Sequence, residues 1–551
     1  TAMEGRSDHA IRLCLDYLDH VGVHWSPHPS EETILSEYQA LLTLIGGRSI
    51  EDLLTLPLLT DPELTATVDV LLGMLTPAFN SDRGLVSLIL CRMGNLGLQH
   101  GNCDASSLGY AFLGMVLGCS FGDYRTGFLF GKLARDLVEQ RGVTRYRGRI
   151  YHTLGTHVLA WTQPIATAQA SLRRGFEEMR EIGDVTYVGF GYCGIITLAI
   201  GAGDPLDSVQ AETEKAMAHV HALKFEMAVD IFTGDLRLVR ALRGLLPDPC
   251  TLDDGGRRFV GGLTTCWYWI RTMQACFIYG DMPAALEAMT RAEPLIASSA
   301  GFFELPEYHF YAALVRAACL EQMTAAARAP HEAALADHRS QLAVWADNCP
   351  ETFTNRLALV DAELARAGGR PLEAMESYER AIRSARDNGF VHNEAIAFEA
   401  AARFYAARGF ETIARTYRQH ARLGYLRWGA NGKVRQLDEL HEHTPAPLVG
   451  AAPSAIEAPS AELDLATVVK TSQAVTSEVG LEKLIETLMA IALEHAGAER
   501  GLLILPRAGE LHIEAEASTD GERGVTVRLR RGVARHPELP ETILHYASRT
   551  Q

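Results

Sequence analysis

The feature that most constrains this chain is a pattern of glycines and small residues that recurs at intervals of about forty residues. Counted from Gly369, the clearest copy has at offsets five, nine, twelve and twenty the residues Ala374, Tyr378, Ala381 and Gly389. Offsets of five, nine and twelve lie on one face of a helix, and glycine accepts the positive φ of a tight turn. The pattern therefore predicts helix pairs, which must stack because a single pair cannot bury its own apolar face.

Further copies of this spacing run along the chain as far as about Leu440. Their first residues are Gly5, Gly122, Gln163, Gly203, Gly280, Gly369 and Gly409. These starts lie about forty residues apart or at near-multiples of that distance, which predicts degenerate copies near residues 47, 84, 242 and 325. We therefore expect residues 1–443 to form a mostly α array of helical repeats.

The clearest copy resembles a known repeat family. Ala374, Tyr378 and Ala381 match the Ala-x3-aromatic-x2-Ala signature of tetratricopeptide repeats (TPR). The chain departs from that family in its longer period and in the poorly kept Trp/Leu-Gly positions of the first helix. The resemblance implies an α-solenoid of TPR-like helix pairs, a scaffold without chemistry of its own.

Two uncharged runs, 105–122 and 186–203, are long enough to cross a membrane. They start two repeat lengths apart and each leads into a Gly-Asp turn, so we expect buried first helices of repeat units and no membrane insertion. The net charge of −17 argues against nucleic acid and anionic lipid as partners. The ten cysteines form no Cys-x-x-Cys pair and lie in apolar stretches, for example Cys193, Cys266 and Cys276, so we expect all of them to be small buried residues in a reducing cytoplasm.

The sequence shows no recognised catalytic motif. The string nearest to a phosphate-binding loop, 429–434, has the wrong spacing, and no Ser or Thr follows Lys433. His20, His24 and His28 share the four-residue spacing of helical metal ligands, but two prolines break that helix and no further ligand completes a site. We therefore expect a non-enzymatic segment with no metal and no cofactor of its own.

The densest aromatic cluster includes Trp267, Tyr268 and Trp269. Arrays of helix pairs often hold a partner peptide in a concave groove, and aromatic anchors suit that role. A bulky buried helix explains the same cluster, and we favour that interpretation.

The pattern changes after about Leu440. Residues 444–462 form a Pro/Ala-rich linker of extended, semi-rigid character. Beyond it, the alternation of apolar residues predicts helices over 465–479 and 481–494, strands over 501–505, 511–517 and 525–529, and a last helix over 540–548.

This order of elements resembles the first half of a GAF domain, with the resemblance carried by 465–479, 481–494 and 498–505. It implies that residues 463–551 are the N-terminal half of an α+β GAF domain. Such domains usually hold a small ligand between sheet and helices, so Leu503, Leu505 and Ile513 would line a pocket unless they only pack the core. Core packing is the interpretation we favour for these residues, and a small ligand of unknown identity is the alternative.

Residues 425–430, the linker and the GAF-like start together resemble the middle of large bacterial hybrid sensor kinases. That family implies a Ser/Thr kinase-like domain and a STAND ATPase upstream, with histidine kinase modules downstream, so we expect this chain to be a segment of a cytoplasmic signalling protein. The implied partners are other proteins or the neighbouring ATPase and kinase domains, with a homodimer through the GAF helices. Two alternatives stay open: a STAND-class transcription regulator, and an enzyme such as a GAF-gated cyclase or phosphodiesterase.

Overall fold

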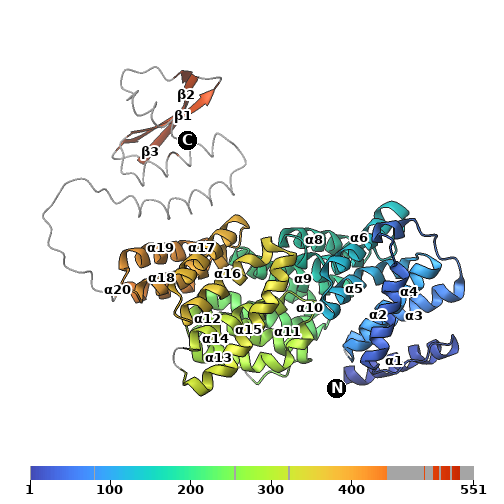
Figure 1. The fold of residues 1–551 in the computed structure, drawn as a ribbon. Helices are drawn as coiled ribbons and strands as arrows, with labels where there is room; N and C mark the ends of the chain where they lie inside the picture. The colour runs from blue at the N-terminus through green and yellow to red at the C-terminus, as the bar shows by residue number, and fades with distance from the viewer. Residues whose placement is uncertain are drawn as a thin grey trace. The chain divides into compact units, whose positions relative to one another are not determined.

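The computed structural model describes residues 2–79, 81–252, 256–320, 323–442, 489, 500–507, 510–520 and 524–533. The chain divides into two compact units, Thr1–Pro445 and Ala446–Gln551. The described part of the first unit is helical, and that of the second contains a three-stranded sheet (Figure 1). The prediction of a mostly helical chain is confirmed. The predicted linker at 444–462, the helices at 465–479 and 540–548 and, apart from Met489, the helix at 481–494 lie outside the described residues.

The helices of the first unit follow one another mostly through short turns. The α-helices are α1 Ala2–His20, α2 Glu31–Ile45, α3 Pro62–Phe79, α4 Arg83–His100, α5 Asp104–Phe121, α6 Tyr124–Arg141, α7 Arg147–His157, α8 Ile165–Glu181, α9 Val185–Ala202, α10 Leu206–Ala222, α11 Glu226–Leu242, α12 Gly262–Tyr279, α13 Met282–Ala292, α14 Glu304–Cys319, α15 Ala325–Asn348, α16 Pro350–Ala367, α17 Pro371–Asp387, α18 Val391–Ala406, α19 Glu411–Trp428 and α20 Asn431–Glu442. The 3-10 helices are η1 Ile50–Thr55, η2 Leu159–Trp161 and η3 Glu293–Ser299.

Gly-Asp pairs build several of the turns between these helices. Gly122 ends α5 at φ 74°, a conformation that favours glycine, and the Asp123 amide donates to the Leu117 carbonyl oxygen at 2.8 Å. The Asp123 carboxylate then accepts the Thr126 amide at 3.0 Å, which starts α6. Positive φ followed by Asp recurs at Gly183, Gly203 and Gly280. One dipeptide thus ends one helix and begins the next.

Three of the expected repeat copies differ from this arrangement. Gly5 lies within α1 and not at a turn, and the copy expected near residue 47 leads only into the short η1. The copy expected near residue 242 is absent, because residues 243–252 and 256–261 carry no helix. Pro247 and Pro249 account for this loop, since proline lacks the amide that a helix interior needs. The positions near 84 and 325 do begin helices, α4 and α15.

Glycines also bring paired helices close together. A Cβ atom on Gly114 of α5 would lie 2.5 Å from the carbonyl oxygen of Gly127 in α6, and one on Gly127 would strike Gly114 in return. In the next pair, a Cβ on Gly155 of α7 would lie 2.7 Å from the Ala168 carbonyl oxygen of α8. These backbones touch where a side chain has no room.

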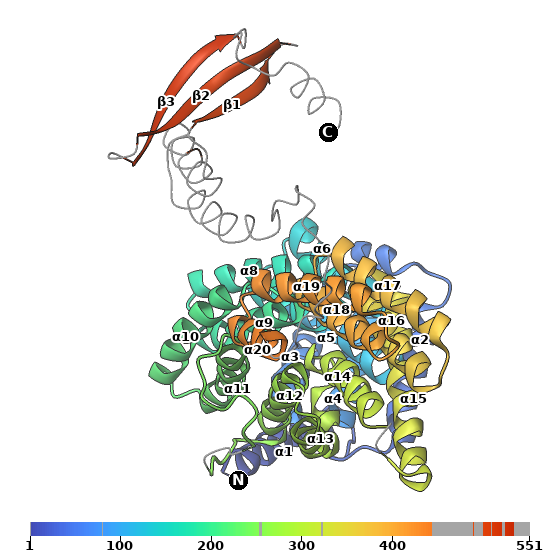
Figure 2. The same cartoon turned by 90° about the vertical axis from the view of Figure 1, so that its left-hand side faces the viewer.

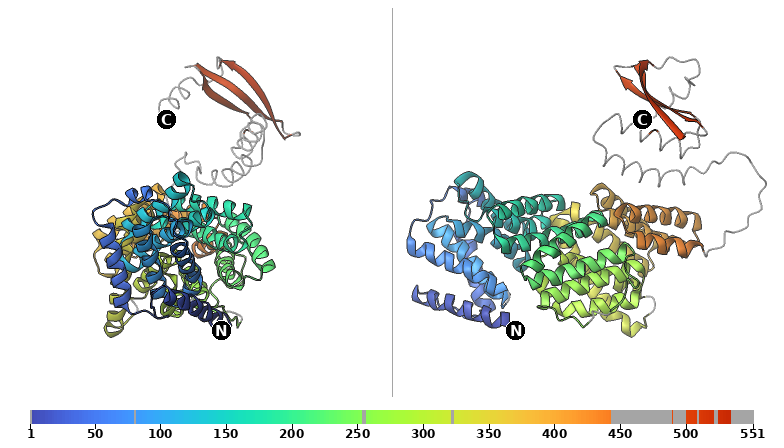
Figure 3. Two further views of the ribbon diagram at one scale, coloured as in Figure 1. Left: turned by 90° about the vertical axis from the view of Figure 1, so that its right-hand side faces the viewer. Right: turned by 180° about the vertical axis from the view of Figure 1, so that it is seen from behind.

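Helices late in the sequence of the first unit contact helices that come much earlier. Trp345 of α15 donates to the Tyr124 hydroxyl of α6 at 2.8 Å, and Arg83 of α4 donates to the Ala300 carbonyl oxygen at 2.9 Å. α1–α4 and α17–α20 lie at opposite ends of the unit (Figures 1 and 3), while α20 lies beside α11 (Figure 2) and also contacts α12. One hydrophobic cluster extends from Tyr124 to Leu437, so the array closes around a filled interior.

The two uncharged runs form α5 and α9. Within the described part of the chain, α9 alone has the length and apolar composition of a membrane span, and 72% of it is buried inside the structure. Its apolar character is that of a helix in the middle of the array, since α8, α10 and α11 all contact it.

The second unit contributes strands β1 Arg500–Arg507, β2 Glu510–Asp520 and β3 Gly524–Val533, antiparallel in the order β1-β2-β3. They contain the three predicted strands. Ala515 and Ala517 of β2 are buried, and Leu503 and Val527 pack against them from the neighbouring strands.

Candidate relay site

The predicted aromatic anchors lie in α12, inside the array. Trp267, Tyr268 and Trp269 are 4–5% exposed. The Trp267 indole donates to the Ser299 hydroxyl at 3.1 Å, and the Arg291 guanidinium lies 4.4 Å from the ring centre of Trp269. These side chains therefore belong to the core of this structure and line no groove open to a partner.

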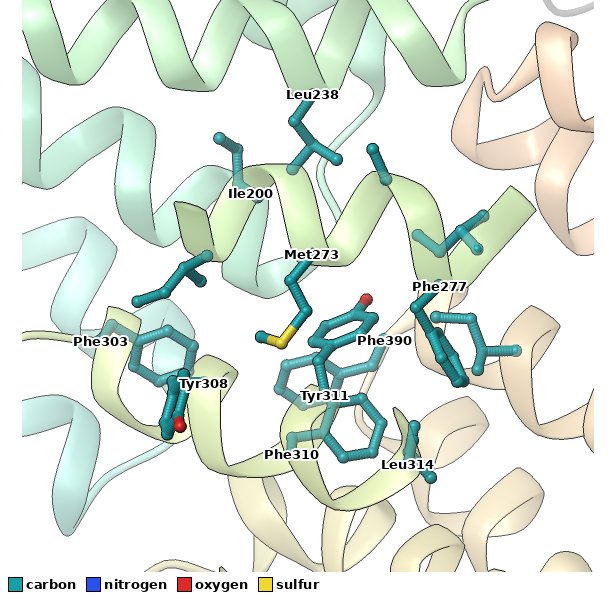
Figure 4. Close-up of a cluster of buried hydrophobic side chains, with 14 of the residues drawn as sticks. Ile200, Leu238, Met273, Phe277, Phe303, Tyr308, Phe310, Tyr311, Leu314 and Phe390 are labelled. Atoms are coloured by element: carbon teal, nitrogen blue, oxygen red, sulfur yellow. The ribbon is translucent and has the colours of Figure 1, made fainter. Parts of the chain in front are cut away.

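The apolar interior around α12 is built by helices far apart in the sequence. Met273 points from α12 toward Phe310 and Tyr311 of α14, while Ile200 of α9 and Leu238 of α11 lie on the other side of α12 (Figure 4). Each of these side chains is buried. α12 is thus the central helix of the closed array.

A network of charged side chains crosses this interior. Arg271 of α12 is 1% exposed, and it donates to Asp235 of α11 at 2.8 Å and to Glu304 of α14 at 3.0 Å. Thr197 of α9 donates to the same Glu304 oxygen at 2.6 Å. Four helices therefore meet at one guanidinium and two carboxylates.

Burial changes the acidity of these carboxylates. Desolvation raises the pKa of Glu304 to about 7, although Arg271 and Thr197 act in the opposite direction. Desolvation also raises the pKa of Asp235. Both groups therefore resist ionisation more than an exposed carboxylate does.

Arg356 of α16 extends the network. Its guanidinium donates to Glu307 at 3.0 and 2.9 Å and to the carbonyl oxygen of Gly201 at 2.8 Å. Gln274 of α12 donates to the other Glu307 oxygen at 2.8 Å, which connects the two arginines through polar contacts. The Arg356 side chain thus connects α16 with α9 and α14. It is fully buried, and a buried guanidinium needs such partners because its charge is shielded from water.

Trp428 closes this region from α19. Its ring centre lies 5.3 Å from that of His392 in α18, and both residues are 2% exposed. Burial, with Arg356 nearby, holds the pKa of His392 well below its usual value, so the imidazole is neutral. The His392 ring packs directly on Gly203, where no Cβ would fit.

The last described helix of the first unit, α20, is held on several sides. The Lys433 ammonium donates to Glu399 of α18 at 2.9 Å, and Gln436 donates to the Tyr279 carbonyl oxygen of α12 at 2.6 Å. Arg435 donates to the Gly244 carbonyl oxygen at 2.8 Å, and a Cβ on Gly432 would lie 2.6 Å from the Gly244 Cα. α20 thus connects early and late helices at the point where the predicted linker begins.

These contacts explain the string that comes nearest to a phosphate-binding loop. Lys433 is 2% exposed and paired with Glu399, and Gly429 ends α19 at φ 89°. Desolvation lowers the pKa of Lys433, while Glu399 opposes that shift. The lysine has a structural role and does not face a ligand.

The other predicted site residues are separate from this network. Leu503 and Ile513 are half-buried in the sheet of the second unit, and the side chain of Leu505 lies outside the described part. His24 pairs with Asp19 at 2.9 Å and His28 with Asp82 at 2.8 Å. The described residues contain no group of three or more His, Cys, Asp or Glu side chains that could hold a metal ion.

Comparisons with known proteins give a distant relationship. No protein family model matches the chain. The hybrid signal transduction histidine kinase G of Dictyostelium discoideum is 22% identical over 272 residues, which are 44% of this chain and 8% of that protein. The chain therefore spans less than a tenth of this relative, and the similarity supports a connection with signalling kinases at a coarse level.

The buried network was not anticipated from the sequence. Its only signal is Arg271, the single charged residue of the otherwise uncharged α12. Lone charges of that kind need a buried partner.

Proposed function

We propose that this chain is the non-catalytic scaffold and relay segment of a multidomain signalling kinase. In this proposal the first unit is an array of TPR-like helix pairs, the second is the N-terminal half of a GAF sensor domain, and ATPase and kinase domains belong to the rest of a cytoplasmic protein. The distant similarity to a hybrid histidine kinase supports the signalling context.

The observation that carries the proposal is the position of α20. This helix is anchored on α12 through Gln436 and on α18 through Lys433, and the Pro/Ala-rich residues 444–462 follow it directly. A change in the packing of α12 or α18 would therefore shift α20. Because the linker follows α20 in the sequence, the shift would be passed on to the linker. Binding of a protein partner, or of the neighbouring ATPase domain, would supply that change.

The direct test is stimulus-dependent phosphorylation by the full-length protein that contains this chain. A long Gly/Ser spacer inserted within 444–461 should uncouple the stimulus from kinase output, because a flexible linker transmits no strain. The same spacer inserted after Gly47, in an exposed turn, is the matched control and should leave coupling intact. Unchanged coupling with the spacer in 444–461 would contradict the relay.

A second measurement addresses the absence of catalysis. We expect no binding of ATP or GTP by residues 1–551, measured by calorimetry. Nucleotide binding by this segment would instead favour an enzyme, and a DNA-binding module in place of kinase modules in the full reading frame would favour a transcription regulator.

A further inference from the structure

Two cysteines meet at the loop that replaces the helix expected near residue 242. Cys250 lies in this loop after Pro249 and is partly exposed, whereas Cys276 is buried in α12. The Cys276 thiol donates to the Cys250 carbonyl oxygen at 3.7 Å, which places the two cysteines side by side. The Cys276 thiol therefore belongs to a helix, and the Cys250 thiol belongs to a loop.

The two thiols differ in acidity. The neighbouring Cys276 side chain lowers the pKa of Cys250; burial and the carboxylates of Asp281 and Asp248 oppose this shift, and Arg237 supports it. The hydrogen bond to Cys250 and burial raise the pKa of Cys276. A partly exposed thiol of lowered pKa beside a buried one is the arrangement of an attacking and a resolving cysteine.

We infer that Cys250 and Cys276 form a redox-active dithiol, a modification site that closes to a disulfide on exposure to a peroxide. The 3.7 Å contact between the Cys276 thiol and the Cys250 backbone carries this inference, which does not depend on the proposed function. It differs from the expectation drawn from the sequence, in which all cysteines are buried and unreactive.

The chemistry balances with hydrogen peroxide as oxidant. The Cys250 thiolate attacks one peroxide oxygen, the O–O bond breaks, and the products are a sulfenic acid on Cys250 and, after proton uptake, one water. The Cys276 sulfur then attacks the sulfenic sulfur, the S–O bond breaks, and the S–S bond forms. The leaving hydroxide takes the Cys276 proton, so two thiols lose two electrons and one peroxide becomes two waters.

The loop around Cys250 also reaches the contacts of α20. The Arg237 guanidinium donates to the Thr251 carbonyl oxygen, and Arg435 of α20 donates to the Gly244 carbonyl oxygen at 2.8 Å. A disulfide from Cys250 to α12 would fix this loop between those two anchors. Oxidation would therefore act beside the helix that precedes the linker.

The test is peptide mass spectrometry of the full chain after exposure to hydrogen peroxide and blocking of free thiols. Trypsin separates the two cysteines, because Arg257, Arg258 and Arg271 lie between them. We expect a linked Cys250–Cys276 peptide pair, lighter by two hydrogens than the two reduced peptides and lost on treatment with dithiothreitol. Recovery of both cysteines as free thiols, or of Cys276 linked to a different cysteine, would overturn the inference.

Matched variants separate this pair from general oxidation. Cys250→Ser and Cys276→Ser should each abolish the linked peptide pair. Cys319→Ser is the control, because Cys319 is also partly exposed but burial raises its pKa, and this variant should retain the pair. Equal loss of the linked pair in all three variants would contradict the assignment.

Discussion

Glu304 sits in the buried interior, where a charge is costly. It is fully buried between Arg271 and Thr197, in a network that contains three carboxylates and two guanidinium groups. Protonation of one carboxylate balances the formal charge, which agrees with the raised pKa of Glu304. The network costs desolvation energy but fixes which helices meet, because any other arrangement would leave a buried charge unpaired.

The first prediction concerns the pH dependence of stability. The pKa of Glu304 rises from 4.5 to about 7 on folding, so between these pH values the folded state binds more protons than the unfolded state. Stability from this group is therefore present below pH 4.5 and lost as the pH rises toward 7. Glu304→Gln cannot titrate at this position. The free energy of unfolding of wild type, relative to that of Glu304→Gln, should therefore fall by on the order of 3 kcal/mol between these pH values, measured by urea unfolding at each pH.

Glu287→Gln is the control for this experiment, because Glu287 is an exposed partner of Arg291 on α13. It should leave the pH profile of wild type unchanged. The comparison must be made as a difference, since burial lowers the pKa of histidines such as His152 and His309 and gives a trend of opposite sign. A Glu304→Gln difference that stays constant with pH would refute the buried acid.

The second prediction concerns the backbone at Lys224. This exposed residue has φ 55° at the turn between α10 and α11, where other turns of the array have glycine. A side chain in this conformation costs about 1–2 kcal/mol, partly offset by the entropy of glycine in the unfolded chain. Lys224→Gly should therefore stabilise the protein by about 0.5–1 kcal/mol in urea unfolding. Lys224→Ala removes the same charge and should give no gain; equal gains in both would point to the charge instead.

Residue roles were only partly predictable from the sequence. The aromatic run at 267–269 was correctly favoured as a buried helix, because its periodicity leaves no polar face. The partners of Arg271 were not predictable, since Asp235 and Glu304 come from different helices that only the closed fold brings together. Cys250 and Cys276 meet for the same reason.

At the scale of helices, glycine determines how closely α5 and α6 approach. The third prediction is that Gly127→Ala destabilises the protein by about 1–3 kcal/mol, because its new Cβ would strike the Gly114 carbonyl oxygen. Gly73 of α3 is the matched control: it is exposed, and a Cβ there meets nothing within 4 Å. Gly73→Ala should stabilise by about 0.5–1 kcal/mol. Thermal unfolding of both variants checks the pair, and destabilisation by both would show that the α5–α6 contact is not special.

Helices that begin at a turn with a local sequence signal were predictable, whereas the prediction of a repeat copy near residue 242 was wrong. Gly-Asp turns act within a few residues, so the positions of α6, α10 and α13 follow from the spacing. The period of about forty residues suggested a helix near residue 242, but Pro247 and Pro249 override it locally. Two prolines so close together disfavour a helix more strongly than a degenerate period favours one.

At the scale of the whole first unit, the closed interior is the main departure from a simple spring-like stack. A stack follows from nearest-neighbour contacts that the sequence repeats. Contacts such as Arg356 with Gly201, or Trp345 with Tyr124, join residues more than a hundred positions apart and leave no periodic trace. They also leave no open groove at the predicted aromatic anchors, so a partner would bind elsewhere or bind a rearranged array.

Closure of the array is tested most directly at α20. This helix has 12 residues, and an isolated helix of that length is marginal in water, so slow exchange of its amides requires the contacts with α12 and α18. We would measure hydrogen exchange of residues 431–442 and 243–252 in wild type, in Gly432→Ala, whose Cβ would press on Gly244, and in Glu439→Ala, an exposed control on α20.

We expect protected amides over 431–442 in wild type and Glu439→Ala, and faster exchange in both segments together in Gly432→Ala. Fast exchange of α20 in wild type, or no change in Gly432→Ala, would contradict the closed array.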